Sequence, residues 1–404
     1  MRPLAKKASA FVLSLGGTAL AGYAFQFIAS RRLGPERYGI YTALMALIMA
    51  FARPLEALSP LVARTILENG RRDWKHDLRG FISLALAAGL VLGAALLIFA
   101  LIWGKGYGLP FAAIFTGALT LVAWAFLYVF RGVLQGHYKD ESYLINRPLE
   151  LFGRLAGSSL LFTPFAGLTS AIAASLIGAA AGVAHIITVM KDQLAGWRAL
   201  PASGYRIFER YLKIMLIWLA GGFFIGLDMI LAKRLFPPAE CGYYAIANLI
   251  GKGALVYAFA LLPLIYPRLV RHRLSRESLR YLGMAAAYSA ALFTGAFFFF
   301  LLWGETVIPF FFGEAFRPAA PLVPLYLAAV FPLSLHFAVI NLGSAVGDWG
   351  ECVFTWSALG VYFLVLWTSP ARFPDYLLRI GIGQALFCAG GCAFLLVRNR
   401  YIPR

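Results

Sequence analysis

Residues 28–43 read IASRRLGPERYGIYTA and residues 230–245 read ILAKRLFPPAECGYYA, so the chain contains one motif twice. The copies share an arginine, a proline, a glycine and a tyrosine in the same order, with one residue inserted in the second copy. These residues are the structural repeat motif: Arg32, Pro35, Gly39 and Tyr41, then Arg234, Pro237, Gly242 and Tyr244. The copies lie roughly half the chain apart, which indicates two copies of one unit and is typical of transporters.

The composition indicates a membrane protein. The 404-residue chain is 61% hydrophobic and 13% charged, with a mean hydropathy of +0.76. A soluble domain needs far less apolar surface, whereas a bilayer requires it. Spanning segments must satisfy their own backbone hydrogen bonds, so the long apolar runs predict helices. A β-barrel would need short alternating segments, which the chain lacks. We therefore predict an all-α polytopic membrane protein.

Apolar runs of about 20 residues predict about twelve transmembrane helices. We expect them at 10–30, 38–61, 80–103, 109–130, 142–162, 165–189, 211–232, 241–266, 281–303, 318–341, 351–369 and 375–397. The longest polar stretch between them predicts a cytoplasmic inter-lobe linker at 191–210. It separates an N-terminal six-helix lobe at 1–190 from a C-terminal six-helix lobe at 211–404.

Lysine and arginine predict the orientation. With a cytoplasmic N-terminus, the inside segments carry about three times as many of these residues as the outside loops. Both termini are then cytoplasmic, in the inner membrane of a bacterium or archaeon. The net charge of +18 has a topological explanation, so nucleic acid is a poor candidate for a partner.

The topology makes the repeats parallel. An even number of helices separates the two motif copies, so both face the outer side and a pseudo-two-fold axis follows the membrane normal. Such halves enclose a central cleft. We expect the motif to shape a hinge or corner, with its prolines and glycines turning the chain. Its tyrosines suit the membrane interface.

Helix 142–162 has the densest set of polar residues at membrane depth. Arg147, Glu150 and Arg154 lie three and four residues apart and share one helix face, and the helical rise places Arg154 near the midplane. Such groups are costly in lipid, so each is a functional candidate. Two roles for Arg154 stay open: an ion pair with Glu150, or a cationic site in the cleft.

Two further helices carry charges at depth. Arg53 is expected to face the cleft with Glu56 as its local partner. Asn248 and Lys252 lie four residues apart on one face, and Lys252 is too deep to reach the interface easily. Lys252 either packs against a carboxylate or lines the cleft. The predicted substrate-binding set is Arg53, Arg147, Arg154, Asn248 and Lys252.

Asp228 is the first candidate for a coupling ion. Its counterpart in the other repeat is Gln26, and polar residues at matching depth in both halves suggest a position that lines the cleft. Asp228 could bind a coupling proton or cation, or it could pair with Lys233 near the outer surface. Glu150 and Glu56 are the other coupling-ion candidates.

Several chemistries are excluded. Gly251-Lys252-Gly253 lacks the upstream glycine and the hydroxyl of a phosphate-binding loop, so ATP is not the direct driving force. No His, Cys or Glu pattern has metal-ligand spacing. We expect buried packing thiols from the four cysteines, no metal, no cofactor and no enzymatic activity.

Three stretches resemble one family. The motif at 33–41, the segment 238–247 after Asp228 and the loop 312–320 are similar to polysaccharide transporters of the multidrug/oligosaccharidyl-lipid/polysaccharide exporter superfamily. The resemblance covers essentially the whole chain. It implies a V-shaped two-lobed bundle that flips undecaprenyl-diphosphate-linked oligosaccharide, such as O-antigen, capsule or exopolysaccharide units, by alternating access. The family's cationic cavity fits Arg53, Arg154 and Lys252.

The resemblance separates this chain from two related branches. The first helix lacks the acidic residue of the drug-efflux branch, and the span count is below that of the peptidoglycan-precursor branch. Cation-coupled small-molecule efflux stays open as an alternative, as do a membrane glycosyltransferase or polymerase and a scaffold for glycan assembly. The expected partners are the lipid-linked substrate, membrane lipids and a glycan polymerase or ligase complex, with the chain itself a monomer.

Overall fold

A computed structural model describes residues 2–68, 74–103, 108–137, 140–163, 167–194, 205–259, 276–344, 349–368 and 372–401. Within these ranges the regular structure is entirely helical, which confirms the all-α prediction. The chain forms two compact units, Met1–Gly226 and Leu227–Arg404. The boundary falls inside one helix, later than the linker expected at 191–210. The predicted lobes therefore remain a prediction, and part of that linker lies outside the described residues.

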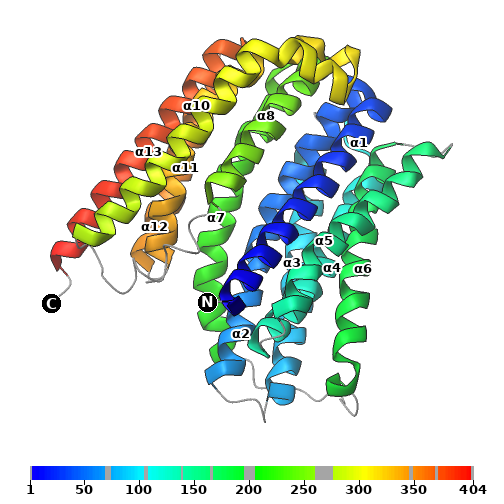
Figure 1. Ribbon diagram of the computed structural model, residues 1–404, viewed down its shortest axis with the longest axis vertical. Coiled ribbons are helices and arrows are strands. Elements are labelled where there is room, and N and C mark those ends of the chain that lie inside the picture. Colours follow the sequence, from blue (N-terminus) through cyan, green and yellow to red (C-terminus); the bar gives the residue numbers. More distant parts are fainter. Residues whose placement is uncertain are drawn as a thin grey trace. The chain divides into compact units, whose positions relative to one another are not determined.

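The first unit is a set of helices (Figure 1), and most of its buried residues are apolar. Its elements are α1 (Arg2–Glu56), α2 (Leu58–Glu68), α3 (Trp74–Trp103), α4 (Phe111–Gly136), α5 (Asp140–Gly157), the short 3₁₀ helix η2 (Ser158–Phe162), α6 (Leu168–Leu194) and the first part of α7 (Tyr205–Leu235). Helix α5 packs against α1 and α6, and α4 packs against α2, α3 and α6.

The second unit contains the rest of α7 and the helices that follow it. They are α8 (Pro238–Phe259), α10 (Arg276–Phe312), the 3₁₀ helix η3 (Glu314–Ala319), α11 (Leu322–Ser344), α12 (Trp349–Trp367) and α13 (Phe373–Tyr401). Helix α11 packs against α8, α10 and α13, and Figure 1 shows α10, α11 and α13 running side by side.

The first repeat motif lies at the junction of two helical segments of α1, the second of which ends at Glu56, before α2 begins at Leu58. The two segments, predicted at 10–30 and 38–61, meet at a kink at Gly34, where φ is +69°. Glycine is favoured at this left-handed conformation because it has no Cβ. Pro35 follows directly and its fixed φ suits the start of the next helical segment. In the second copy, α7 ends at Leu235 and α8 begins at Pro238, so Pro237 lies between two separate helices.

Length and hydropathy make the chain a multi-pass membrane protein. Within the described residues, six segments are long and apolar enough to cross a bilayer. They are Gly16–Leu67, Leu78–Ile102, Phe111–Gly136, Leu168–Lys191, Ile214–Leu235 and Gly283–Phe312. Two shorter apolar helices are Leu322–Leu335 and Cys352–Trp367.

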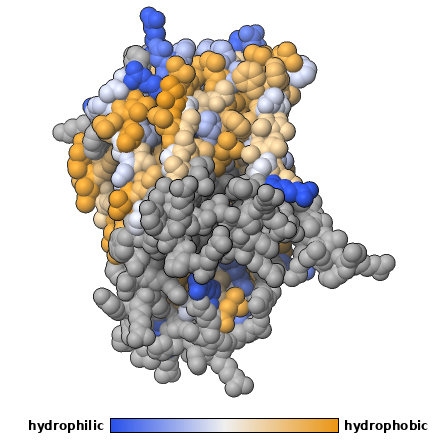
Figure 2. All heavy atoms as spheres, turned by 90° about the vertical axis from the view of Figure 1, so that its left-hand side faces the viewer, coloured by the Kyte–Doolittle hydropathy of each residue, from blue (hydrophilic) through white to orange (hydrophobic). Residues whose placement is uncertain are grey.

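The outer face of α10 is apolar. Phe298, Leu302, Trp303 and Phe310 are all exposed on this helix. Figure 2, in which the left-hand side of Figure 1 faces the viewer, shows mostly apolar residues where the surface is coloured. Contact of such a surface with lipid chains is favourable, whereas its contact with water is unfavourable.

Glycines allow close helix packing inside the first unit. Gly222 and Gly226 of α7 lie four residues apart and contact α1 at Ala50 and Ala46. A Cβ added at Gly222 would lie 2.6 Å from the Ala50 backbone oxygen. Small residues at this spacing are characteristic of helix contacts in membranes, where close approach replaces the hydrophobic driving force.

Candidate functional site

Helix α5 presents two different faces inside the first unit. One face carries Asn146, Glu150 and Gly153 and packs toward α4 and α6. The other face carries Leu151 and Arg154 and packs toward α1. At 3.6 residues per turn, positions 147, 151 and 154 lie about a quarter-turn from positions 146, 150 and 153. The acid and the arginines therefore have different neighbours.

Glu150 pairs with an arginine of α4. Arg131 Nη2 lies 2.7 Å from Glu150 Oε2, and its Nε donates to Asn146 Oδ1 at 2.7 Å. Trp124 Nε1 donates to the other carboxylate oxygen at 2.8 Å. The side chain of Arg131 is 3% exposed and that of Glu150 is 14% exposed. Of the two roles left open for Arg154, the ion pair with Glu150 is not formed, because a buried guanidinium from the neighbouring helix already occupies the carboxylate.

Sequence reasoning missed Arg131 because it placed the end of this helix at residue 130. In the structure α4 continues to Gly136, and Gly132 and Gly136 contact α2 closely. The apolar run Val129 to Leu134 around Arg131 is the signal that could have extended the helix.

Arg154 lies among aromatic rings of α1. Its Nη2 donates a hydrogen bond to the Tyr41 hydroxyl, and its guanidinium carbon lies 4.3 Å from the centre of the Phe25 ring. Its Nε is buried and has no hydrogen-bond partner. Among the described residues Arg154 forms no ion pair. A hydroxyl oxygen and a ring face both attract a cation, and neither carries a negative charge.

Arg147 is the second arginine on this face of α5. It is exposed and, within the part of the chain that the structure describes, forms no ion pair or hydrogen bond. It lies seven residues, or about two turns, from Arg154, so the two guanidinium groups belong to one helix face.

Arg53 behaves differently from these two arginines. Its Nη1 lies 2.8 Å from Glu56 Oε2, as the sequence predicted, and the Tyr128 hydroxyl contacts the other oxygen at 3.3 Å. The Arg53 side chain is 38% exposed and that of Glu56 is 21% exposed. The pair of Arg53 and Glu56 is therefore partly exposed, whereas the pair of Arg131 and Glu150 is largely buried.

The second unit holds a buried carboxylate surrounded by donors. Asp228 Oδ2 accepts hydrogen bonds from Tyr244 at 2.8 Å, Asn248 at 2.7 Å and Tyr326 at 2.7 Å. Lys252 Nζ lies 3.1 Å from Oδ1. The Tyr376 hydroxyl donates to the Asp228 backbone oxygen. Four helices, α7, α8, α11 and α13, thus meet at one aspartate.

The structure decides between alternatives that the sequence left open for this cluster. Asp228 pairs with Lys252 and not with Lys233, and Lys252 does pack against a carboxylate. The Asn248 amide donates to Asp228 and Tyr326, so it already has partners within the unit. Tyr326 and Tyr376 were not predicted, because nothing near them in the sequence indicates a buried acid.

The motif tyrosines Tyr41 and Tyr244 are buried inside their own units, and their position at the membrane interface stays a prediction. Both are 0% exposed, and each contacts a charged residue of its own unit. The motif arginines also have equivalent surroundings. Arg32 lies over the Phe162 ring at 3.9 Å and Arg234 over the Trp367 ring at 4.2 Å. In each motif, therefore, the arginine lies over an aromatic ring and the tyrosine hydroxyl forms a hydrogen bond with a charged side chain.

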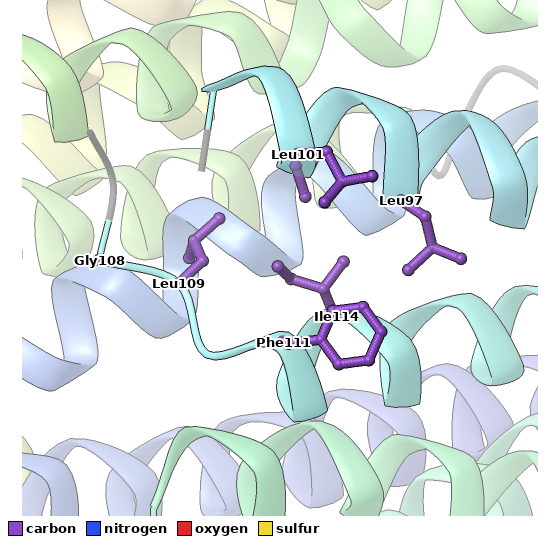
Figure 3. Close-up of a pocket in the computed structure, with 7 residues that line it drawn as sticks. Leu97, Leu101, Gly108, Leu109, Phe111 and Ile114 are labelled. Atoms are coloured by element: carbon purple, nitrogen blue, oxygen red, sulfur yellow. The ribbon is translucent and has the colours of Figure 1, made fainter. Parts of the chain in front are cut away.

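The pocket in Figure 3 is apolar and lies away from these charges. It is lined at the end of α3 and the start of α4, and its volume is about 280 Å³. Its lining is Leu97, Ala100, Leu101, Gly108, Leu109, Phe111 and Ile114. Within the described residues, no group of three or more His, Cys, Asp or Glu side chains could hold a metal ion.

A sequence model described as "Polysaccharide biosynthesis protein" matches residues 4–273 of this chain. The chain belongs to this polysaccharide biosynthesis protein family. A search of curated proteins finds no match. The family match covers the first unit from residue 4 onward, and it includes Asp228, Tyr244, Asn248 and Lys252 of the second unit but not Tyr326 or Tyr376.

Solved structures show that this family member has a transporter fold. The inward-facing conformation of a multidrug resistance MATE family transporter of the MOP superfamily matches with a TM-score of 0.71 and 14% identity, over 94% of each chain. The lipid II flippase MurJ, in an inward closed conformation, matches with a TM-score of 0.69 and 10% identity. That match covers 97% of this chain and 88% of MurJ. At these identities the likeness shows the fold alone.

Proposed function

We propose that this polysaccharide biosynthesis family member flips a polyprenyl-diphosphate-linked oligosaccharide across the cytoplasmic membrane. The substrate would be an undecaprenyl-diphosphate unit of O-antigen, capsule or exopolysaccharide. The observation that carries the proposal is the pair of arginines on α5, Arg147 and Arg154, which form no ion pair among the described residues. The family match and the likeness of the fold to a lipid II flippase support it.

An unpaired cation at membrane depth needs an explanation by function. Charged groups in membrane helices are rare and mark binding sites or ion pathways. The ring of Phe25 and the hydroxyl of Tyr41 hold the Arg154 guanidinium but leave its charge uncompensated. A diphosphate supplies the missing anion, and a guanidinium binds phosphate oxygens through two parallel hydrogen bonds.

The other residues predicted to bind the substrate would have to exchange their present partners for the diphosphate. Arg53 and Lys252 already hold carboxylates, so a diphosphate must compete with Glu56 or Asp228 for them. Asn248 would donate only if it released its partners in the Asp228 cluster. We therefore assign the first contact with the diphosphate to Arg154 and Arg147. The sugar would cross the membrane together with the diphosphate, and the prenyl chain would stay in the lipid.

The proposed cycle is alternating access without enzymatic chemistry. The coupling-ion candidates remain Asp228, Glu150 and Glu56, and the structure gives each of them an internal cation. The proposal includes cytoplasmic termini, a monomeric transporter and contact with a glycan polymerase or ligase. These follow from the charge bias and the resemblance.

Surface glycan in cells tests the proposal. In a strain that lacks the chain, wild-type protein should restore surface glycan, and the Arg154→Gln and Arg147→Gln variants should lose it at equal protein level. Arg37→Gln is the matched control, because Arg37 is exposed and lies on α1, whereas Arg147 and Arg154 lie on α5. Normal glycan export by Arg154→Gln would refute the role of the cation.

Small-molecule efflux is the second candidate, because a multidrug MATE transporter has the same fold. It predicts that overexpression raises drug resistance and that surface glycan is unaffected by loss of the chain. The opposite pattern supports the flippase.

A further inference from the structure

The Asp228 cluster differs from an open cation site in how its two oxygens are used. Oδ2 receives three neutral donors, from Tyr244, Asn248 and Tyr326. Oδ1 receives the ammonium of Lys252 at 3.1 Å. Each carboxylate oxygen offers about two acceptor positions, so the three neutral donors fill Oδ2 and Lys252 is the one donor to Oδ1 among the described residues. The charge of the acid is balanced by one charge of the same chain.

The two partners also differ in depth. The Asp228 side chain is 3% exposed and the Lys252 side chain is 20% exposed. The ammonium therefore belongs to the more accessible side chain of the pair. A cation that approaches Oδ1 meets this positive charge at 3.1 Å from the oxygen. To bind Asp228 it must displace Lys252 and leave an ammonium without a counter-ion in an apolar unit, which is unfavourable.

We infer that the Lys252 ammonium is a built-in counter-cation of Asp228, in the position that an exchangeable metal cation such as Na⁺ would take. Asp228 in this chain therefore binds no metal cation. The inference deepens the coupling step of the proposed function, since it leaves the Asp228 site closed to sodium.

Removal of the ammonium should open the site. A neutral side chain at position 252 leaves Asp228 with one free oxygen beside the hydroxyl oxygens of Tyr244 and Tyr326. Carboxylate and hydroxyl oxygens are hard donors of the kind that bind hard cations. The Lys252→Gln and Lys252→Met variants should therefore gain a Na⁺ site, whereas Lys252→Arg keeps the charge and should not.

Binding of radioactive Na⁺ to the purified full-length protein in detergent tests the inference directly. Wild-type protein should bind no more Na⁺ than Asp228→Asn. Lys252→Gln should bind about one Na⁺ per chain in a saturable way, and the double variant with Asp228→Asn should lose it. The matched control is Lys191→Gln, since Lys191 is exposed at the end of α6, and it should equal wild type.

Thermal unfolding in NaCl and in choline chloride of equal ionic strength provides the second measurement. Lys252→Gln should unfold at lower temperature in choline and recover by about 3 °C in NaCl, because a ligand stabilises the state that binds it. Saturable Na⁺ binding by wild type that Asp228→Asn abolishes would overturn the inference. So would a folded Lys252→Gln with no Na⁺ response. Neither assay involves glycan, so the inference and the flippase proposal fail separately.

Discussion

Replacement of Arg131 by methionine should destabilise the first unit strongly. The variant keeps the apolar stem but leaves the Glu150 carboxylate without its cation and the Asn146 oxygen without its donor. Loss of one partner from a buried pair destabilises by about 3 kcal/mol, because the remaining charge stays buried. For a unit of this size, that change lowers the unfolding temperature by about 6–12 °C.

A double-mutant cycle separates the ion pair from lost packing. Glu150→Gln should also destabilise the unit, because it leaves the arginine charged and 3% exposed. The double variant Arg131→Met with Glu150→Gln should be more stable than the sum of the single changes predicts, by about 2 kcal/mol, since both charges are gone. Thermal unfolding of the purified protein in detergent measures all three variants.

The exposed pair of Arg317 and Glu314 on η3 is the matched control. These side chains are 53% and 70% exposed. Exposed pairs contribute about 0–1 kcal/mol, so Arg317→Met should change the unfolding temperature by only about 2 °C. Equal effects of Arg131→Met and Arg317→Met would refute the closed, buried pair at Glu150.

Two further predictions concern helix packing and the cationic site. Gly222→Ala should lower the unfolding temperature, because the added Cβ would collide with the backbone of α1, whereas Gly221→Ala meets nothing within 4 Å and should match wild type. Equal stability of the two variants would contradict the close contact. Tyr41→Phe removes one hydroxyl partner of Arg154, and the loss of one hydrogen bond of about 1 kcal/mol predicts a roughly fivefold slower initial rate of lipid flipping in vesicles. A wild-type rate would show that the hydroxyl does not position the guanidinium.

Apolar runs in the sequence predict most of the helices, because membrane helices must be about 20 residues long and almost uniformly apolar. The predicted ranges 80–103 and 351–369 lie close to α3 and α12. The predicted end of α4 was wrong, because the helix continues to Gly136. Stopping at residue 130 assigned Arg131 to a loop and so hid the partner of Glu150.

Helix geometry explains the failed expectation for Asp228. Residues five apart, such as Asp228 and Lys233, point in different directions on a helix and do not meet. Lys252 reaches the carboxylate from α8, as Tyr326 does from α11. Contacts between helices far apart in sequence depend on packing, which periodicity does not encode. The repeat did align Gln26 with Asp228, and both accept hydrogen bonds from tyrosines in or beside the motif.

The sequence predicts a corner at the repeat motif but not the contacts of its tyrosines. The motif was predicted to form a corner with tyrosines in the interface, and Gly34 does kink α1. Yet Tyr41 and Tyr244 are fully buried against Arg154 and Asp228. These contacts could not be predicted from the sequence, because tyrosine occurs both at membrane interfaces and as a buried hydrogen-bond donor.

Reconstitution into vesicles measures lipid flipping by the protein itself. Purified protein in sealed vesicles would be given a fluorescent polyprenyl-diphosphate sugar, and the fraction that becomes accessible to a membrane-impermeant quencher would be followed. We predict rapid exchange with wild type and with Arg37→Gln, and the background rate of protein-free vesicles with Arg154→Gln. Exchange at the wild-type rate by Arg154→Gln, or no exchange above background by wild type, would contradict the account.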